Sequence, residues 1–284
     1  MLKCVVYVAT AYGYEGLMRQ RTGMEKVLAA DGIDLILMQK EERLEVPFLA
    51  DTLFLTDDAE TYKWLNGKKY PASVFYHEGN KDVYFEGAPY ALENVAELSG
   101  RAYEEAYRRL VGLPWDIMET ERLKVRESTV ADVPEFYRIY GQEGITRYMD
   151  DLLTDADEEK AYMEDYIRQF YGFYGFGMWT VIYKETGQVI GRAGLSLREG
   201  YELPELGFVI APSYQGKGLA YEVCRGILKY AREELLFDQV QAFAEAENEA
   251  SVNLLKKLGF AFVNREKLKD KEYLLFQKKI EDDI

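Results

Sequence analysis

The stretch that decides the fold of the second half reads Ile210-Ala211-Pro212-Ser213-Tyr214-Gln215-Gly216-Lys217-Gly218-Leu219-Ala220. A strand-like run, Glu205–Ile210, stops at Pro212, and a glycine-bearing turn then opens a helix predicted from Gly218 to Glu234. Apolar residues recur at helical spacing along that helix, which predicts one buried face. Glycines let the main chain approach a ligand closely, and the free N–H groups of a helix start suit a pyrophosphate. The stretch therefore predicts a phosphate-binding strand–turn–helix.

The pattern Gln/Arg-x-x-Gly-x-Gly/Ala within this stretch is weak alone, because it occurs a second time at Gln188–Ala193. That copy follows a hairpin turn at Glu185–Gly187 and lies inside a predicted strand, with no helix behind it. The local context therefore favours the copy that begins at Gln215.

The chain has 284 residues, 48% of them hydrophobic, which is enough for two modest domains or one large one. The first half alternates short strands with short helices and predicts a small three-layer α/β domain. Its expected strands are 2–9, 33–38, 52–55 and 72–76, and its expected helices are 24–30, 59–65 and 92–110. Leu113-Pro114-Trp115 breaks this pattern, so we place a boundary near residue 118 and expect domains over 1–117 and 118–284.

The second half predicts a mixed α/β domain of order β-α-α-β-β-β-α-β-α-β-β. Its expected strands are 123–126, 179–183, 189–197, 205–210, 240–244, a short one near Phe262, and 273–278. Thr129-Val130-Ala131-Asp132 is typical of a capping box at the start of the first helix. The other helices are expected at 157–170, 218–234 and 249–258.

Charge and composition exclude several classes of function. The net charge of −15 disfavours nucleic-acid binding and suits a cationic or amine-bearing substrate, although simple solubility explains it equally well. No apolar run approaches the roughly 20 residues of a spanning helix, so no membrane partner is expected. The apolar N-terminus could be a weak signal sequence, but its β-branched residues favour a buried strand and hence a soluble, cytoplasmic protein.

Metal and nucleophile chemistry have few candidate residues. The two cysteines, Cys4 and Cys224, are too few for a disulfide framework or a cysteine-based metal site, and we expect no metal. His77 is the only histidine, so any Ser-His-Asp triad would have to use it. A structural role is the expectation for this residue.

Residues from about Arg122 to Ile280 resemble the GCN5-related N-acetyltransferase (GNAT) superfamily, and within it the subgroup that includes the ribosomal-protein alanine acetyltransferases. Four landmarks in the expected order carry the resemblance: the strand 122–126 with its capped helix, Val189-Ile190-Gly191, Glu205–Ile210 followed by Gln215–Ala220, and Asn248-Glu249-Ala250-Ser251 ahead of Lys257-Leu258-Gly259-Phe260. The resemblance implies a central mixed sheet with two splayed strands, and acetyl-CoA between strands 205–210 and 240–244.

The resemblance also implies direct transfer of an acetyl group from acetyl-CoA to an amine. Main-chain groups of Phe208, Val209 and Ile210 would hold the pantetheine arm, and the N–H of Val209 or a neighbour would polarise the thioester carbonyl. The turn residues of the pyrophosphate site would be Gln215, Gly216, Lys217, Gly218, Leu219 and Ala220. Lys217 either meets a cofactor phosphate or is a solvated lysine.

The resemblance identifies the acid and base residues less completely than the cofactor-binding residues. Glu205 matches the family's carboxylate base and Glu202 is a second choice, but both could be solvated loop carboxylates. The family's usual proton donor is a Tyr seven residues after the Asn of the fourth landmark, and here Leu255 stands in its place. Ser251 could donate a hydrogen bond to the departing thiolate, or cap a helix. Asn248 would bind pantetheine or cap the same helix.

Two further segments have alternative interpretations. The aromatic run Tyr171–Phe176 lines an acceptor pocket or simply packs, and packing is favoured. Asp57 and Asp58 end a strand in the first half, which faintly resembles haloacid-dehalogenase-like or receiver-like domains. The dehalogenase pattern needs an Asp after the first strand, where Val8-Ala9-Thr10 stands instead, so we expect a non-catalytic domain for sensing or dimerisation.

Three hypotheses follow. The first is an acetyl-CoA-dependent N-acetyltransferase whose acceptor is a protein N-terminus or a small-molecule amine, acting without a metal, as a monomer or a homodimer. The second is a degenerate acyltransferase fold that senses CoA or a metabolite. The third is phosphotransfer by the first domain through Asp57.

Overall fold

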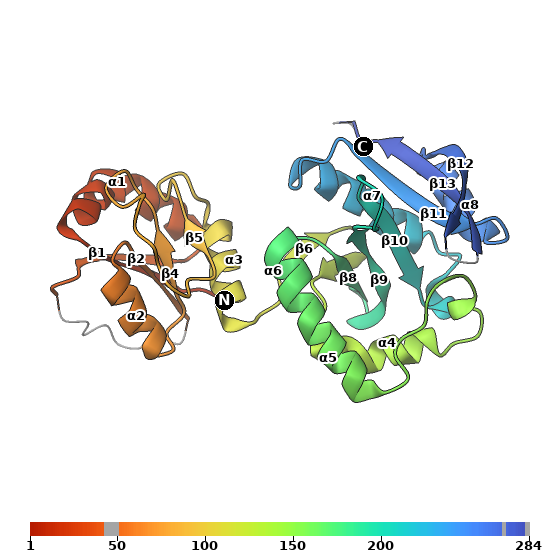
Figure 1. The fold of residues 1–284 in the computed structure, drawn as a ribbon, viewed down its shortest axis with the longest axis horizontal. Helices are drawn as coiled ribbons and strands as arrows, with labels where there is room; N and C mark the ends of the chain where they lie inside the picture. Colours follow the sequence, from red (N-terminus) through yellow and green to blue (C-terminus); the bar gives the residue numbers. More distant parts are fainter. Residues whose placement is uncertain (43–50, 269–270, 282–284) are drawn as a thin grey trace. The chain divides into compact units, whose positions relative to one another are not determined.

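A computed structural model of the protein describes residues 1–42, 51–268 and 271–281. The chain divides into two compact units, Met1–Trp115 and Asp116–Ile284, which are described separately here (Figure 1). Across the described ranges, no helix is both long enough and apolar enough to cross a membrane.

The first unit is built on a parallel sheet of strand order β2-β1-β3-β4-β5. Its elements are β1 (Cys4–Ala9), α1 (Ala11–Ala30), β2 (Asp34–Gln39), β3 (Thr52–Thr56), α2 (Ala59–Gly67), β4 (Ala72–Phe75), β5 (Ala91–Leu92) and α3 (Gly100–Val111). All six residues of β1 are buried, as expected for the central strand of a sheet covered on both faces.

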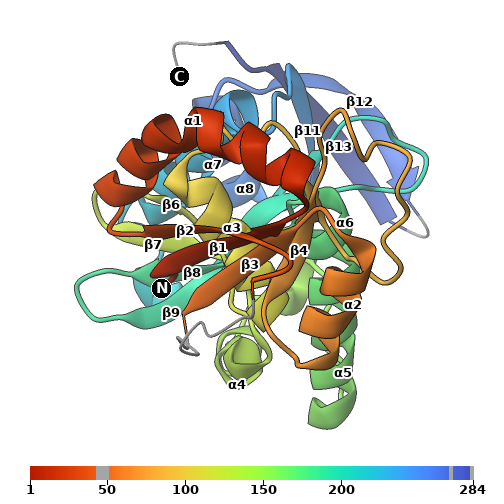
Figure 2. The ribbon, with the colours of Figure 1, turned by 90° about the vertical axis from the view of Figure 1, so that its left-hand side faces the viewer.

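Successive side chains of β1 enter two separate hydrophobic cores. One core holds Val5 and Tyr7 with residues of α1 and α3, and the other holds Val6 and Val8 with Tyr62 and Leu65 of α2. Figure 2 shows α1 and α2 on opposite sides of the strands. The predicted three-layer α/β arrangement of the first half is therefore confirmed.

Two helices of the first unit differ from the expected ranges. Helix α1 begins at Ala11, well before the predicted residue 24, because Leu17 is buried in the core despite the glycines around it. Helix α3 begins only at Gly100, where the Ser99 hydroxyl accepts a hydrogen bond from the Ala102 N–H. The predicted start near residue 92 is wrong, because Leu92 lies in β5 and Asn94 has a positive φ of 48°.

The second unit is built on a mixed sheet of strand order β12-β13-β11-β10-β9-β8-β7-β6. Its strands are β6 (Asp116–Glu119), β7 (Leu123–Arg126), β8 (Met178–Tyr183), β9 (Gln188–Ser196), β10 (Glu205–Ile210), β11 (Gln239–Glu245), β12 (Ala261–Leu268) and β13 (Lys271–Lys279). Its main helices are α4 (Val133–Tyr140), α5 (Ala156–Tyr166), α6 (Gly172–Tyr174), α7 (Leu219–Glu233) and α8 (Glu249–Lys257). The predicted order is confirmed, and β6 is an additional strand.

Helices cover both faces of this sheet. Trp179 packs its ring edge-on against Tyr230 of α7, with ring centroids 5.5 Å apart. The next residue, Thr180, points to the opposite face and donates a hydrogen bond to Asp132 at the start of α4. Helices α7 and α4 therefore lie on opposite faces of the sheet.

The entry to α4 is held by Asp132, as the capping pattern predicts. Its carboxylate accepts hydrogen bonds from the Thr129 N–H at 2.8 Å and from two nitrogens of Arg126, each at 2.7 Å. Burial acts to raise the pKa of Asp132, but the hydrogen bonds from Arg126 and Thr129 outweigh it and leave the pKa below its ordinary value. The ionised carboxylate is therefore part of the folded state.

Candidate active site

Strand β10 has one fully paired edge and one that is almost free. It pairs with β9 from Glu205 opposite Ser196 to Ile210 opposite Gly191. Its parallel pairing with β11 consists of a single position, Glu205 opposite Gln241. The two strands therefore part beyond Glu205, and this splay is what the family resemblance implies.

The register decides which main-chain groups of β10 face the parted strand. The Ala211 N–H donates to the Ile190 carbonyl of the β9 side at 2.8 Å. Because ladder bonds alternate along a strand, the N–H of Val209 also faces β9, whereas those of Phe208 and Ile210 face β11. Among the three residues expected to hold pantetheine, Phe208 and Ile210 thus present their N–H groups to the gap.

The glycine-bearing turn follows β10 directly. Gly216 and Gly218 have φ values of 71° and 78°, a region that disfavours residues with a Cβ. Gly218 precedes the first turn of α7, whose N–H groups, those of Leu219 and Ala220 among them, have no acceptor within the helix. The Gln215 side chain turns back and donates to the Ile210 carbonyl at 2.7 Å, closing the end of the strand.

Glu222, one turn into α7, anchors this turn to the β6–β7 connection. Its carboxylate accepts from the Thr120 hydroxyl at 2.5 Å, from the Arg122 N–H at 2.9 Å and from Arg122 Nε at 2.7 Å. Arg122 also donates to the Lys217 carbonyl at 3.1 Å. Burial acts to raise the pKa of Glu222, but the hydrogen bonds from Thr120 and Arg122 outweigh it and lower the pKa. Sequence inspection missed this pair because its members lie far apart in the chain.

Lys217 projects from the turn into solvent. Its Nζ lies 5.1 Å from the centre of the Tyr214 ring, a cation–π contact, and its side chain is exposed. An exposed lysine at this place can meet an anion that binds the turn.

Asn248 and Ser251 lie together at the start of α8. The Asn248 side chain accepts a hydrogen bond from the Ser251 N–H at 3.2 Å, so Asn248 caps the helix. The Ser251 side chain is half-buried. Leu255 is 1% exposed and packs into the core, so this position supplies no proton donor.

Glu205 is engaged by a cation from the β9–β10 connection. Its two carboxylate oxygens accept from Arg198 Nε at 2.6 Å and from the second terminal nitrogen of Arg198 at 2.9 Å, a bidentate pair. The Glu205 side chain is 12% exposed and that of Arg198 is 38% exposed. Glu202, the second choice for a base, is exposed in the same connection. Arg198 was not identified from the sequence, because nothing local marks an arginine in a loop.

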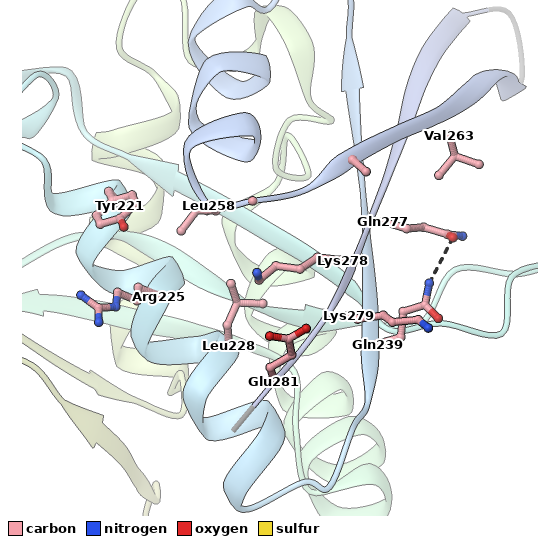
Figure 3. A pocket seen from close by; sticks show the side chains of 12 residues that line it. Tyr221, Arg225, Leu228, Gln239, Leu258, Val263, Gln277, Lys278, Lys279 and Glu281 are labelled. Atoms are coloured by element: carbon pink, nitrogen blue, oxygen red, sulfur yellow. Dashed lines mark hydrogen bonds between the residues drawn. The ribbon is translucent and has the colours of Figure 1, made fainter. Parts of the chain in front are cut away.

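A pocket of about 770 Å³ opens beside α7, between that helix, the end of α8 and strands β12 and β13 (Figure 3). It is lined by Tyr221, Arg225, Leu228, Gln239, Leu258, Gly259, Ala261, Val263, Gln277, Lys278, Lys279 and Glu281. Within residues 1–42, 51–268 and 271–281, no carboxylate forms an ion pair with Arg225, Lys278 or Lys279. With three cations against one carboxylate, Glu281, the lining has a net positive charge on an acidic protein, and the pocket adjoins the first turns of α7.

The residues of the aromatic run 171–176 differ in how deeply they are buried. Tyr171 is buried and donates to the Met178 carbonyl at 2.5 Å, and burial raises its pKa. Phe173 is 81% exposed. Packing explains Tyr171, whereas the exposed Phe173 contacts the ring of Tyr174 edge-on, with ring centroids 4.9 Å apart.

In the first unit, Asp57 is buried and fully engaged. Its oxygens accept from the Thr10 N–H at 2.7 Å and from the Thr10 hydroxyl at 2.5 Å, and one of them lies 2.9 Å from His77 Nε2. The Gly79 N–H donates to His77 Nδ1 at 3.0 Å, so both ring nitrogens have partners. His77 thus links its own segment after β4 to Asp57 after β3, and Asp57 in turn holds Thr10 after β1.

The comparisons with known proteins concern the second unit. The family model "Acetyltransferase (GNAT) domain" matches residues 122–261. The uncharacterized N-acetyltransferase YoaA of Bacillus subtilis is 28% identical over 145 residues, which are 51% of this chain and 82% of that protein. The uncharacterized N-acetyltransferase YnaD of the same species is 26% identical over 144 residues, 49% of this chain and 79% of that protein.

Solved structures show the same fold. A putative GnaT-family acetyltransferase from Bordetella pertussis aligns with 57% of this chain and 98% of its own, with a TM-score of 0.50 and 21% identity. The ribosomal-protein-S5-alanine acetyltransferase from Vibrio fischeri aligns with 58% of this chain and 97% of its own, with a TM-score of 0.51 and 17% identity. The family model and these relatives identify the second unit as an acetyltransferase (GNAT) domain and support acetyltransferase activity.

Proposed function

We propose that the second unit transfers an acetyl group from acetyl-CoA to a primary amine. The observation that carries the proposal is the free edge of β10, which continues directly into the glycine turn and the start of α7. This edge offers main-chain donors to an amide-bearing arm, and the turn offers N–H groups to a pyrophosphate. The cationic pocket beside α7 adds attraction for an anionic cosubstrate.

In this proposal each residue has a defined task. Gln215, Gly216, Gly218, Leu219 and Ala220 shape the phosphate-binding turn. Lys217 adds charge at its rim. The N–H groups of Phe208 and Ile210 bind the pantetheine arm, and the one nearest the thioester carbonyl polarises it. Val209 fills the core between them, with 6% exposure. Asn248 holds the start of α8 and so places Ser251.

Acetyl-CoA supplies a thioester carbonyl that an amine can attack. Glu205 accepts a proton from the acceptor ammonium, directly or through a water, so that the nitrogen lone pair becomes available. The new C–N bond forms as the C–S bond breaks, the electron pair leaves with the sulfur, and the second proton of the attacking nitrogen passes to the thiolate to give the free thiol of CoA. The Ser251 hydroxyl donates a hydrogen bond to that departing thiolate. No covalent bond to the protein is required.

Calorimetric titration with acetyl-CoA, followed by thiol release over a panel of amines, tests the proposal. We expect binding in the micromolar range and amine-dependent thiol release. Absence of binding at millimolar acetyl-CoA would refute it. Binding without thiol release for any amine would favour the second candidate, a CoA sensor. Two observations favour the sensor. Leu255 is buried and supplies no proton donor, and Glu205 is already paired with Arg198.

For the first unit, we propose a non-catalytic role in sensing or in association with a second copy. Every oxygen of Asp57 is occupied by Thr10 or His77, which leaves a poor nucleophile for phosphotransfer. A magnesium-dependent phosphatase activity that is lost in Asp57→Asn would contradict this role. Light scattering of the full chain tests association.

A further inference from the structure

The Arg198 guanidinium lies among groups that would equally suit a substrate cation. Besides its bidentate pair with Glu205, it lies over the Phe243 ring, 4.8 Å from the ring centre. Tyr201 packs edge-on against the same ring at 5.0 Å. A carboxylate and an aromatic face that meet around one cation are the usual components of an alkylammonium site. We define Glu205, Phe243 and Tyr201 as the cation cage.

The cage is at the point where the two splayed strands begin to part. Glu205 is opposite Gln241 in the sheet, and Phe243 follows two residues later in β11. Residues two apart in a strand point to the same face, so Glu205 and Phe243 share one face of the sheet. The cage therefore adjoins the free edge of β10, where the proposed thioester would lie.

The charge around the cage is negative. Burial and the nearby Glu266 carboxylate raise the pKa of Tyr201. Arg198 is the cation that balances Glu205, and its side chain is 38% exposed in an irregular connection. The guanidinium side of the pair is open to solvent, so a competing ammonium can reach Glu205 and displace Arg198.

Direct contact between Glu205 and the acceptor favours such a displacement. A base that acts directly must come within hydrogen-bond distance of the proton that it removes, and Arg198 occupies one lone pair on each oxygen of Glu205 and the space beside them. We propose that Arg198 is a tethered mimic of the acceptor, and that a protonated primary alkylamine displaces it from the cation cage before reaction. Arg198 is thus a specificity-determining residue that covers Glu205 until the acceptor, a cationic alkylamine, replaces it. We call Arg198 in this role the latch. This inference rests on the proposed acetyl transfer.

The first test separates a latch from a positioning residue. Arg198→Ala frees Glu205, so the KM for n-butylamine should fall at least about fivefold, a factor that corresponds to about 1 kcal/mol, while kcat does not fall. Arg198→Lys keeps a tethered cation, so its KM should lie between the values of Arg198→Ala and the wild type. Arg265→Ala removes an exposed pair with Glu272 on β12 and β13, and should change neither constant. A loss of kcat at unchanged KM in Arg198→Ala would overturn the latch.

A second test does not depend on turnover. Ethylguanidinium resembles the end of an arginine side chain and cannot be mistaken for the alkylamine acceptor. By calorimetry it should bind Arg198→Ala at least fivefold more tightly than the wild type, and the added Glu205→Gln change should abolish this gain. Equal binding to wild type and Arg198→Ala would overturn the inference. If the wild type binds no acetyl-CoA, the proposed function fails, but the ethylguanidinium result still decides whether the cage exists.

Discussion

Replacing Glu222 by Ala tests whether the phosphate-binding turn depends on its anchor to the β6–β7 connection. The change leaves the Thr120 hydroxyl and the Arg122 N–H without their acceptor, at about 1 kcal/mol each. The ion pair adds less than about 1 kcal/mol, because the Arg122 side chain is 39% exposed. The free energy of unfolding should therefore fall by roughly 2–3 kcal/mol. The control is Glu233→Ala in the same helix, where the carboxylate is 52% exposed and 3.8 Å from Lys229.

Urea unfolding at constant m-value measures both variants, and calorimetry measures their affinity for acetyl-CoA. We expect weaker binding in Glu222→Ala alone, since Arg122 then no longer holds the Lys217 carbonyl. The folded-state pKa of Glu222 is lowered, so its contribution is complete above the unfolded-state pKa and is lost as the pH falls through the lower folded-state value. The gap between wild type and variant should thus narrow below about pH 4. Equal stability of Glu222→Ala and Glu233→Ala at pH 7 would refute the reasoning.

Three further tests address other parts of the molecule. Gly13→Ala places a Cβ 2.1 Å from an Asp57 oxygen, so it should destabilise the first unit by about 1–3 kcal/mol in thermal unfolding. The control is Gly23→Ala in the same helix, whose Cβ meets nothing within 4 Å and which should stabilise the first unit by about 0.5–1 kcal/mol. Asp132→Asn should lower the free energy of unfolding, measured in urea, by about 2–4 kcal/mol at pH 7. The difference should shrink below about pH 4, because the carboxylate has a lowered pKa and its contribution is lost as the pH falls. An equally large difference at pH 3 would contradict this. Gly218→Ala imposes about 1–2 kcal/mol of strain at a φ of 78° and should weaken acetyl-CoA binding at least fivefold by calorimetry; wild-type affinity would show that the turn does not bind it.

The parts of the fold that could be predicted from the sequence are those with a local signal. Strand β10, its glycine turn and helix α7 follow each other directly, and apolar spacing and glycine identify all three. Asp132 could be placed because a capping box has its donor and acceptor three residues apart. In the first unit, the apolar runs of β1 and β3 gave the central strands of the sheet.

The parts that were missed depend on contacts distant in sequence. The part of α1 that was not predicted, residues 11–23, contains Gly13, Gly16 and Gly23, which lower helix propensity, yet burial of Leu17 against the sheet overrides it. Gly13 is needed for the close approach of Asp57, a requirement that no local pattern shows. The partners of Glu205 and Glu222 could not be identified for the same reason, since charged residues are abundant and only the folded chain selects Arg198 and Arg122.

The single pairing position between β10 and β11 also affects how the second unit opens. The sheet is continuous by strand order, but its two blocks, β6 to β10 and β11 to β13, share one rung, Glu205 opposite Gln241. Amide protons of the three-strand block should therefore exchange with solvent together, as a cooperative unit of lower stability than the five-strand block. A ligand that binds both parted strands would act as a second rung and slow that exchange on both sides of the junction at once.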